Sequence, residues 1–279
     1  MRYLVGLSGG KDSTAVMLWV IHESAYPPES VEFVFSPTGL EAPVTLQYID
    51  FLSGHIQNAG YAPIRHILPP MDFFQLAEHK HRFPSRKAQF CTDHLKIRPL
   101  RAYIATIPDQ VISISGTRAD ESTARAELPE RAFDKAGHQV FRPILTWSEA
   151  DVFAYLQKYH IPRNPLYDLG FKRVGCLPCI NSRKQELHLL ATHFPEIITR
   201  IRNAEHRLGV SFYARTFVPA THRTWHAEYK GKAWLLPSID DAVRWSFTAR
   251  GGKQYALPPD LATLAALNAL HDQHANPEP

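Results

Sequence analysis

The chain has 279 residues, of which 44% are hydrophobic, and it carries 31 basic and 27 acidic side chains for a formal net charge of +4. This composition excludes a disordered chain and is sufficient for the core of one large domain or of a domain with an appendage. No run of about 18 uncharged apolar residues occurs, so we expect no membrane span and a cytoplasmic protein. The small positive excess permits nucleotide or nucleic acid partners without requiring them.

The first motif lies at the N-terminus, where an apolar run ending at Leu7 leads directly into a short polar loop. The loop residues are Ser8, Gly9, Gly10, Lys11, Asp12 and Ser13. Two adjacent glycines let the backbone turn sharply, and the positive end of the helix that follows favours bound negative charge. The spacing differs from that of a Walker A loop. A plain turn is the alternative, but the strand before the loop and the helix after it favour a phosphate site.

Strand-like and helical segments alternate along the first half of the chain. Strands are expected at Tyr3–Leu7, Val31–Phe35, Ile64–Leu68 and Val111–Ser115, and helices at Ser13–Glu23, Pro43–Gly60 and Leu95–Ile107. This order predicts an α/β fold with a doubly wound, mostly parallel sheet, in which ligands bind at the carboxyl ends of the strands. Gly39 and Gly116 follow the second and fourth strands. We therefore expect both glycines to lie beside the phosphate loop and to contact the nucleotide.

The pattern changes in the second half. We expect helices at Thr146–His160, Lys184–Leu208 and Asp260–His271, with an aromatic, basic region at Phe212–Tyr255. The chain is therefore divided into a nucleotide-binding domain, 1–183, and a smaller helical and aromatic appendage, 184–279. Trp225, Trp234 and Trp245 could stack nucleic acid bases, but packing within the appendage is the favoured interpretation.

Two arginines follow the fourth strand. Arg118 and Arg125 lie one or two helical turns apart in a segment that also contains acidic residues. A planar guanidinium suits phosphate oxygens, whereas a solvated helix start with Glu/Arg pairs is the alternative. The nearby phosphate loop favours the binding role.

The three cysteines form a CxxC pair and one distant partner. Cys176 and Cys179 could present two thiolates to a metal, and Cys91 precedes Thr92-Asp93-His94. Together the three thiols could hold a [4Fe-4S] cluster with one open iron, which is the favoured interpretation. Zinc closed by His94 and free thiols are the alternatives, because spacing alone does not separate iron from zinc.

Taken in order, these motifs resemble the phosphoadenosine phosphosulfate reductase family over about 180 residues. The resemblance is carried by the phosphate loop, Thr38-Gly39-Leu40-Glu41, Cys91-Thr92 with Leu95-Lys96-Ile97 and Pro99, Gly116 to Arg125, Pro143-Ile144, Asp151-Val152, and Ile161 to Asp168 followed by the CxxC. It implies the adenine nucleotide alpha-hydrolase fold of the N-type ATP pyrophosphatases. It also implies that the loop residues Ser8 to Ser13 bind ATP with Mg²⁺, that Arg118 and Arg125 meet anionic groups, and that Lys11, Asp12 and Arg118 serve catalysis.

Two departures from the family refine the functional expectation. Pro37 stands where some members have an acidic residue, and no cysteine follows Cys179, so the nucleophile of sulfonucleotide reduction is absent. The chain is more similar to the DNA-phosphorothioation sulfurtransferase branch. That similarity implies an ATP pyrophosphatase that adenylylates an acceptor for sulfur transfer, with a nucleic acid acceptor, a sulfur-donor protein and a homodimer as expected partners. The alternatives are a thiol-dependent sulfonucleotide reductase and a non-catalytic ATP-binding component of a defence or mobile-element complex.

Overall fold

A six-stranded sheet forms the centre of the N-terminal part in the computed structural model, which describes residues 1–229 and 231–249. Its strands are β1 (Arg2–Leu7), β2 (Val31–Phe35), β3 (Arg65–His66), β4 (Val111–Ile114), β5 (Arg131–Phe133) and β6 (Gln139–Phe141). They follow the order β3-β2-β1-β4-β6-β5, and every neighbouring pair is parallel except β5 with β6. Because β1 pairs with both β2 and β4, the chain reverses its direction of winding there. The predicted α/β fold class is confirmed.

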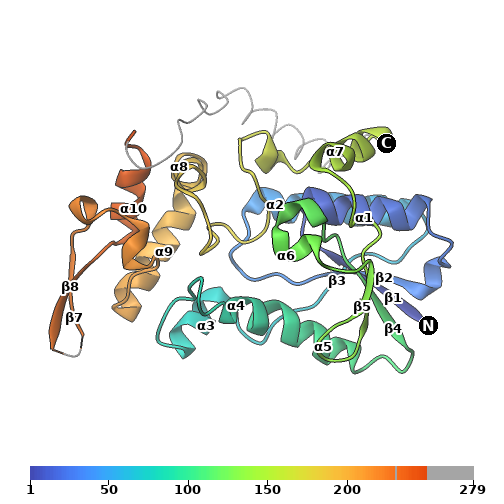
Figure 1. Cartoon of the computed structure of the whole chain (residues 1–279), viewed down its shortest axis with the longest axis horizontal. Coiled ribbons are helices and arrows are strands. Elements are labelled where there is room, and N and C mark those ends of the chain that lie inside the picture. Colours follow the sequence, from blue (N-terminus) through green and yellow to red (C-terminus); the bar gives the residue numbers. More distant parts are fainter. Residues whose placement is uncertain (230, 250–279) are drawn as a thin grey trace, which may run out of the picture.

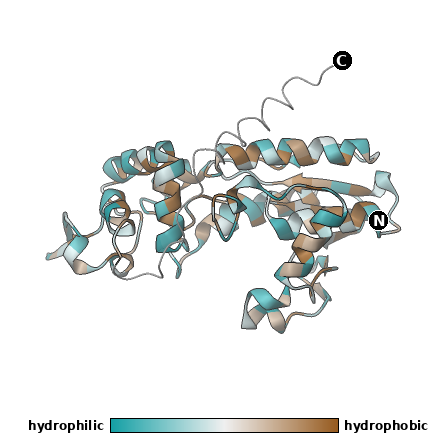
Figure 2. Cartoon of the chain, turned by 90° about the horizontal axis from the view of Figure 1, so that it is seen from above, coloured by the Kyte–Doolittle hydropathy of each residue, from teal (hydrophilic) through white to brown (hydrophobic). Residues whose placement is uncertain are grey.

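Helices cover both faces of this sheet (Figure 1). On one face lie α1 (Lys11–His22), α2 (Pro43–Asn58) and α7 (Glu149–Lys158), and on the other lies α5 (Arg98–Ile104). Side chains of neighbouring residues in β1 point to opposite faces of the sheet. Val5 packs in the cluster on the α1 side, and Leu4 packs in the cluster on the α5 side. Hydrophilic and hydrophobic residues alternate along the helices (Figure 2), as expected when one face of each helix is buried.

Shorter elements connect these layers. They are α3 (Phe73–His79), α4 (Phe90–Thr92), the π-helix η2 (Asp93–Ile97), α6 (Thr123–Ala126) and the 3₁₀ turns η1 (Pro28–Ser30), η3 (Ala119–Glu121) and η4 (Pro165–Tyr167). The helix expected at Leu95–Ile107 is therefore a π-helical turn that continues into α5. The strand expected at Ile64–Leu68 is only two residues long, because Pro63 and Pro69 flank it. The β5–β6 hairpin was not predicted, since its strands are three residues each.

The C-terminal part is helical with one hairpin. It contains α8 (Lys184–His193), α9 (Pro195–Leu208), η5 (Arg215–Phe217), η6 (Ala220–His222), β7 (Trp225–Tyr229), β8 (Lys232–Leu236) and α10 (Ile239–Ser246). The single helix expected at Lys184–Leu208 is broken at Phe194, whose φ is −137°. Proline disfavours helical backbone at the residue before it, so Pro195 ends α8 and starts α9.

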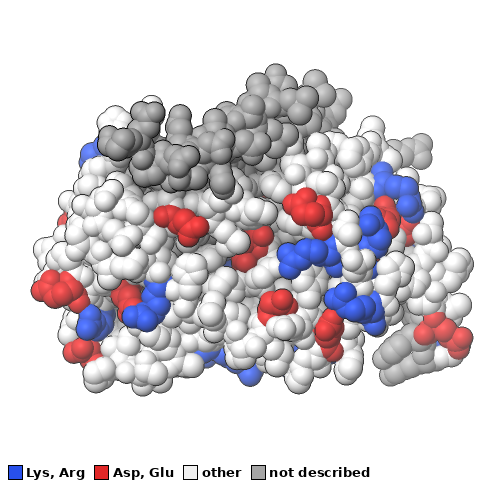
Figure 3. Space-filling model, turned by 180° about the vertical axis from the view of Figure 1, so that it is seen from behind, with Lys and Arg blue, Asp and Glu red and all other residues white. Residues whose placement is uncertain are grey.

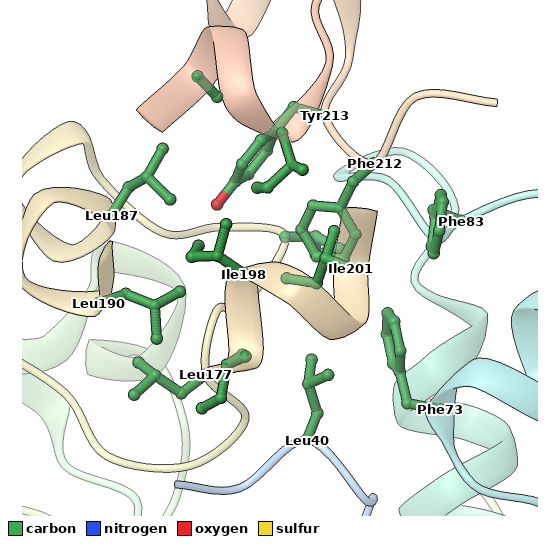
Figure 4. Close-up of a cluster of buried hydrophobic side chains, with 14 of the residues drawn as sticks. Leu40, Phe73, Phe83, Leu177, Leu187, Leu190, Ile198, Ile201, Phe212 and Tyr213 are labelled. Carbon is green, nitrogen blue, oxygen red and sulfur yellow. The ribbon is translucent and has the colours of Figure 1, made fainter. Parts of the chain in front are cut away.

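One hydrophobic cluster joins the two parts. Leu40, Phe73 and Leu177 pack in it with Leu190 of α8 and Ile201 of α9 (Figure 4). Apolar packing is therefore continuous across residue 183, and the division of the chain at that point stays a prediction. Trp245 is buried in the same cluster, whereas Trp225 and Trp234 are half-buried.

No helix within residues 1–229 and 231–249 is long and apolar enough to cross a membrane. The expected helix Asp260–His271 lies outside the described residues, as does the end of the aromatic region from residue 250.

Candidate nucleotide and thiol site

The phosphate loop, residues 8–13, joins β1 to α1 and is held in shape by its own serines. Ser13 Oγ donates to the Gly10 carbonyl at 2.9 Å and accepts the Ser8 N–H at 3.2 Å. The Gly10 N–H reaches Ser8 Oγ at 3.4 Å. Gly9 has a φ of +71°, and a Cβ there would lie 3.0 Å from Thr45 Cγ2, so the turn needs glycine. The loop is therefore held in shape by contacts among its own residues.

Residues distant in sequence fix the loop from two sides. From one side, Asn164 Nδ2 donates to the Gly9 carbonyl at 3.1 Å and the Tyr167 hydroxyl accepts the Lys11 N–H at 3.0 Å. From the other side, the segment after β4 packs so closely that a Cβ on Gly116 would lie 2.9 Å from the Asp12 carbonyl. Gly116 thus lies beside the phosphate loop, where its lack of a side chain permits the contact.

The charged residues of this region neutralise one another. Lys11 is 8% exposed, and its Nζ lies 3.3 Å from Asp12 Oδ2 and 3.7 Å from Glu149 Oε2. Arg118 is 2% exposed, and its Nε donates to Asp12 Oδ1 at 2.5 Å while Nη1 donates to Asp120 Oδ1 at 2.7 Å. Arg118 was expected to meet anionic groups of the nucleotide. In the structure its buried guanidinium bonds to Asp12 of the phosphate loop, and its contact with a nucleotide stays a prediction.

Gly39 lies in the turn after β2, and Arg125 lies in α6. Gly39 has a φ of +79°, and its neighbour is Asp72, whose Cβ would lie 2.9 Å from an added Cβ. The carboxylate of Glu41 accepts the Gly39 N–H at 3.0 Å, so this glycine serves the turn after β2. Arg125 is exposed, pairs with Glu121 and lines a cavity that also contains the cysteines.

Two adjoining cavities connect the loop to the thiols. The first, of about 200 Å³, lies at the carboxyl ends of β1 and β2 and includes Ser8 and Ser36. The second, of about 510 Å³, is lined by all three cysteines, Cys91, Cys176 and Cys179. Lys96 and Gly175 line both cavities. The fold therefore brings the distant Cys91 to the CxxC pair, beside the phosphate loop.

The thiols share this cavity without forming a metal-ligand set. Burial, followed by the neighbouring Cys176, raises the pKa of the Cys91 thiol, and burial likewise raises the pKa of Cys176. Among the described residues, no three His, Cys, Asp or Glu side chains are grouped to hold a metal ion. His94 is not part of the cavity lining, and its Nε2 lies 4.0 Å from Asp93 Oδ2. Neither the [4Fe-4S] cluster nor the zinc alternative is supported by this arrangement.

Four residues of the site were not predicted from the sequence. Asn164 and Tyr167 hold the loop, while Lys96 and Arg173 add positive charge at the cysteine cavity. All four lie in or beside the motifs that carried the family resemblance. Their roles depend on contacts between segments far apart in sequence, which no local pattern reveals.

Comparison with known proteins places this geometry in a family. Residues 2–182 match the phosphoadenosine phosphosulfate reductase domain, which covers the sheet, the phosphate loop and all three cysteines. The chain belongs to this family. An uncharacterized 37.8 kDa protein of Escherichia phage 186 is 35% identical over 91% of this chain and 90% of its own length.

Other members of the phosphoadenosine phosphosulfate reductase family match over less of their length. The adenosine 5'-phosphosulfate reductase of Allochromatium vinosum is 38% identical over 34% of this chain and 36% of that protein. Among solved structures, the phosphoadenylyl-sulfate (PAPS) reductase of Candida auris superposes with a TM-score of 0.50 at 18% identity, over 63% of this chain and 81% of that one. At this identity the likeness concerns the fold alone.

Proposed function

We propose that this protein is an ATP pyrophosphatase that adenylylates a nucleic acid acceptor in preparation for sulfur transfer. The observation that carries the proposal is the pair of adjoining cavities, which joins a preformed phosphate loop to three thiols through Lys96 and Gly175. A site for nucleotide binding alone has no need of three cysteines at its edge.

The cations of the site suit such chemistry. Lys96, Arg125 and Arg173 line the cysteine cavity, and Lys96 also reaches the cavity at the strand ends. Within the described part of the chain, no ion pair involves Lys96 or Arg173. Positioned cations stabilise the charge that develops on transferred phosphates and on leaving pyrophosphate. ATP with its Mg²⁺ is therefore expected to lie between the phosphate loop and these three side chains.

The proposed reaction has two steps. An acceptor oxygen attacks the α-phosphorus of ATP, so that the new O–P bond forms while the bond to pyrophosphate breaks. Sulfide supplied by a donor protein then attacks the acceptor atom that carries the adenylylated oxygen, and this oxygen leaves as part of AMP with the bonding electron pair. The three thiols of the cavity orient the sulfide, whose oxidation state does not change.

No step is assigned to a metal. Thiol donors suit iron or zinc chemically, but Cys91, Cys176 and Cys179 are not arranged as a ligand set. The [4Fe-4S] hypothesis is tested by anaerobic purification followed by iron, sulfide and zinc analysis. Stoichiometric iron and sulfide that disappear in Cys91→Ser, Cys176→Ser and Cys179→Ser would support it, whereas metal-free protein that still transfers sulfur would exclude it.

The adenylylation step is tested with ATP labelled at the α-phosphate. Incubation with oligonucleotides should place label on the acceptor, and Lys11→Ala should weaken ATP binding about ten- to hundredfold through the loss of one charge-assisted contact. Lys135→Ala removes the same charge from an exposed turn and serves as the control. Unchanged ATP affinity in Lys11→Ala, measured by calorimetry, would refute the assignment of the phosphate loop.

A second candidate function is favoured by the similarity to adenosine 5'-phosphosulfate reductases. In that case the protein would reduce a sulfonucleotide with a thiol borrowed from another protein, since no cysteine follows Cys179. Release of labelled sulfite from a sulfonucleotide in the presence of thioredoxin would support this reaction over adenylylation.

A further inference from the structure

A large cavity among the described residues lies outside the nucleotide and thiol site. It measures about 870 Å³ and is enclosed by the segment after Phe83, the start of α8, the segment around Tyr213 and α10. This volume lies within the range of pockets that bind small molecules. We refer to it as the α8–α10 cavity.

The α8–α10 cavity has a basic and aromatic lining. Arg86, Lys87, Arg183 and Lys184 contribute to it, and no acidic residue stands among its described lining residues. Lys184 Nζ bonds to the carbonyl of Thr248, but no carboxylate within residues 1–229 and 231–249 pairs with the other three. Since Arg86, Lys87 and Arg183 are exposed, their charges are available to an anion.

The aromatic wall has an unused donor. Tyr213 and Phe217 stack with ring centroids 3.9 Å apart, and Trp245 meets Phe217 edge-on at 5.6 Å. Trp245 is 6% exposed, and its indole N–H has no hydrogen-bond partner among the described atoms. A buried donor without a partner is costly, and a ligand that supplies an acceptor would remove that cost.

Another sizeable cavity differs in character. The cavity between β2 and α5 is lined by Arg2 and Arg65, but carboxylates pair with both: Asp109 with Arg2 and Glu32 with Arg65. The molecular face shown in Figure 3 likewise carries acidic and basic side chains side by side. The α8–α10 cavity therefore differs from the β2–α5 cavity in that Arg86, Lys87 and Arg183 have no carboxylate partner among the described residues.

We propose that the α8–α10 cavity binds one unpaired nucleotide of the nucleic acid acceptor. The base would stack on Phe217 and accept a hydrogen bond from the indole N–H of Trp245, and flanking phosphates would contact Arg86, Lys87 and Arg183. Aromatic side chains and cations are the means by which proteins bind single-stranded nucleic acid, because every base has a stacking face and every linkage a negative charge. A duplex base must leave the stack to enter such a pocket.

The location of the cavity suits this role. Ile180 and Ser182 line both the α8–α10 cavity and the cysteine cavity. A nucleotide held in the first would place its strand at the edge of the second, where the thiols lie. This inference rests on the proposed function for the identity of the acceptor.

Crosslinking tests the proposal with the full chain. A single-stranded oligonucleotide carrying one 5-iodouracil is irradiated with the protein, and the attached peptide is identified by mass spectrometry. Attachment at Phe217 or Trp245 is expected, and attachment confined to other regions would overturn the proposal. DNA and RNA versions of the oligonucleotide distinguish the two acceptors.

Binding measurements provide the matched variants. Phe217→Ala should weaken oligonucleotide binding about five- to hundredfold, the range found for loss of one base stack. The double change Arg86→Ala and Lys87→Ala should weaken binding and reduce its salt dependence. The control, Lys135→Ala with Lys158→Ala, removes two exposed charges elsewhere and should leave binding unchanged. Trp245→Phe is used in place of Trp245→Ala, because an alanine could unfold the hydrophobic cluster. The change in tryptophan fluorescence that accompanies oligonucleotide binding is expected to be lost in Trp245→Phe.

The outcomes separate this inference from the proposed function. ATP binding and pyrophosphate release do not require the α8–α10 cavity, so Phe217→Ala should retain both. Protein that releases pyrophosphate but binds oligonucleotides equally well in all these variants would refute the cavity assignment alone. Oligonucleotide binding that depends on Phe217, in protein that never uses ATP, would refute the proposed function and leave the cavity assignment standing.

Discussion

The Tyr167 hydroxyl accepts a backbone N–H that the proposed phosphate site would otherwise offer to ATP. It accepts the Lys11 N–H at 3.0 Å, at the first residue of α1. In Tyr167→Phe, ATP no longer has to displace the hydroxyl from this N–H. A neutral hydrogen bond contributes about 0.5 to 1.5 kcal/mol, so the variant should bind ATP roughly two- to tenfold more tightly and be slightly less stable. Calorimetry checks this, with Tyr103→Phe as control because its hydroxyl bonds to Glu32 far from the loop. Weaker ATP binding in Tyr167→Phe would show that the hydroxyl helps to hold ATP.

Arg118 and Arg125 should respond differently to substitution. Arg118 is buried against Asp12 and Asp120, and removing one partner of a buried ion pair costs about 3 to 5 kcal/mol. Arg118→Ala should therefore lower the free energy of unfolding by about 3 kcal/mol, whereas Arg125→Ala, in an exposed pair, should change it by less than about 1 kcal/mol. Chemical denaturation measures both. Equal stabilities would contradict the stabilising role of the buried Arg118 ion pairs.

At the scale of elements, Glu205 of α9 makes the stability of the C-terminal part depend on pH. Its carboxylate accepts the N–H of Phe212 at 2.7 Å and that of Ile239 at 2.8 Å, and burial raises its pKa to about 7. The folded chain therefore holds a proton that the unfolded chain has lost. As the pH rises from about 4.5 to 7, Glu205 therefore lowers the free energy of unfolding by up to about 3 kcal/mol.

The test compares thermal unfolding of the protein and Glu205→Gln from pH 4.5 to pH 8. Glutamine does not titrate, so the variant should lack the fall in stability over this interval. The same fall in both proteins would assign it to other groups.

Elements with a strong periodic pattern were predictable from the sequence. The phosphate loop, the long strands and α2 follow from apolar runs, paired glycines and amphipathic spacing. Cooperation between distant segments was not predictable. The hairpin β5–β6 has strands too short for a pattern, and the burial of Arg118 depends on Asp12, 106 positions away.

At the scale of the whole molecule, the cysteine cavity adjoins two other cavities and connects them. The cavity at the strand ends shares Lys96 and Gly175 with the cysteine cavity, which shares Ile180 and Ser182 with the α8–α10 cavity. The hydrophobic cluster of Figure 4 supports the walls between the sheet and the C-terminal helices. Under the proposed function, the C-terminal part would present the acceptor to the nucleotide site.

The central claim is that ATP is cleaved between its α- and β-phosphates. The most direct measurement uses ATP labelled at the γ-phosphate, incubated with Mg²⁺ and a single-stranded oligonucleotide, and identifies the labelled product. The proposed reaction predicts labelled pyrophosphate together with adenylylated oligonucleotide, formed by the unaltered protein and lost in Lys11→Ala. Labelled orthophosphate together with ADP, or no consumption of ATP, would contradict it.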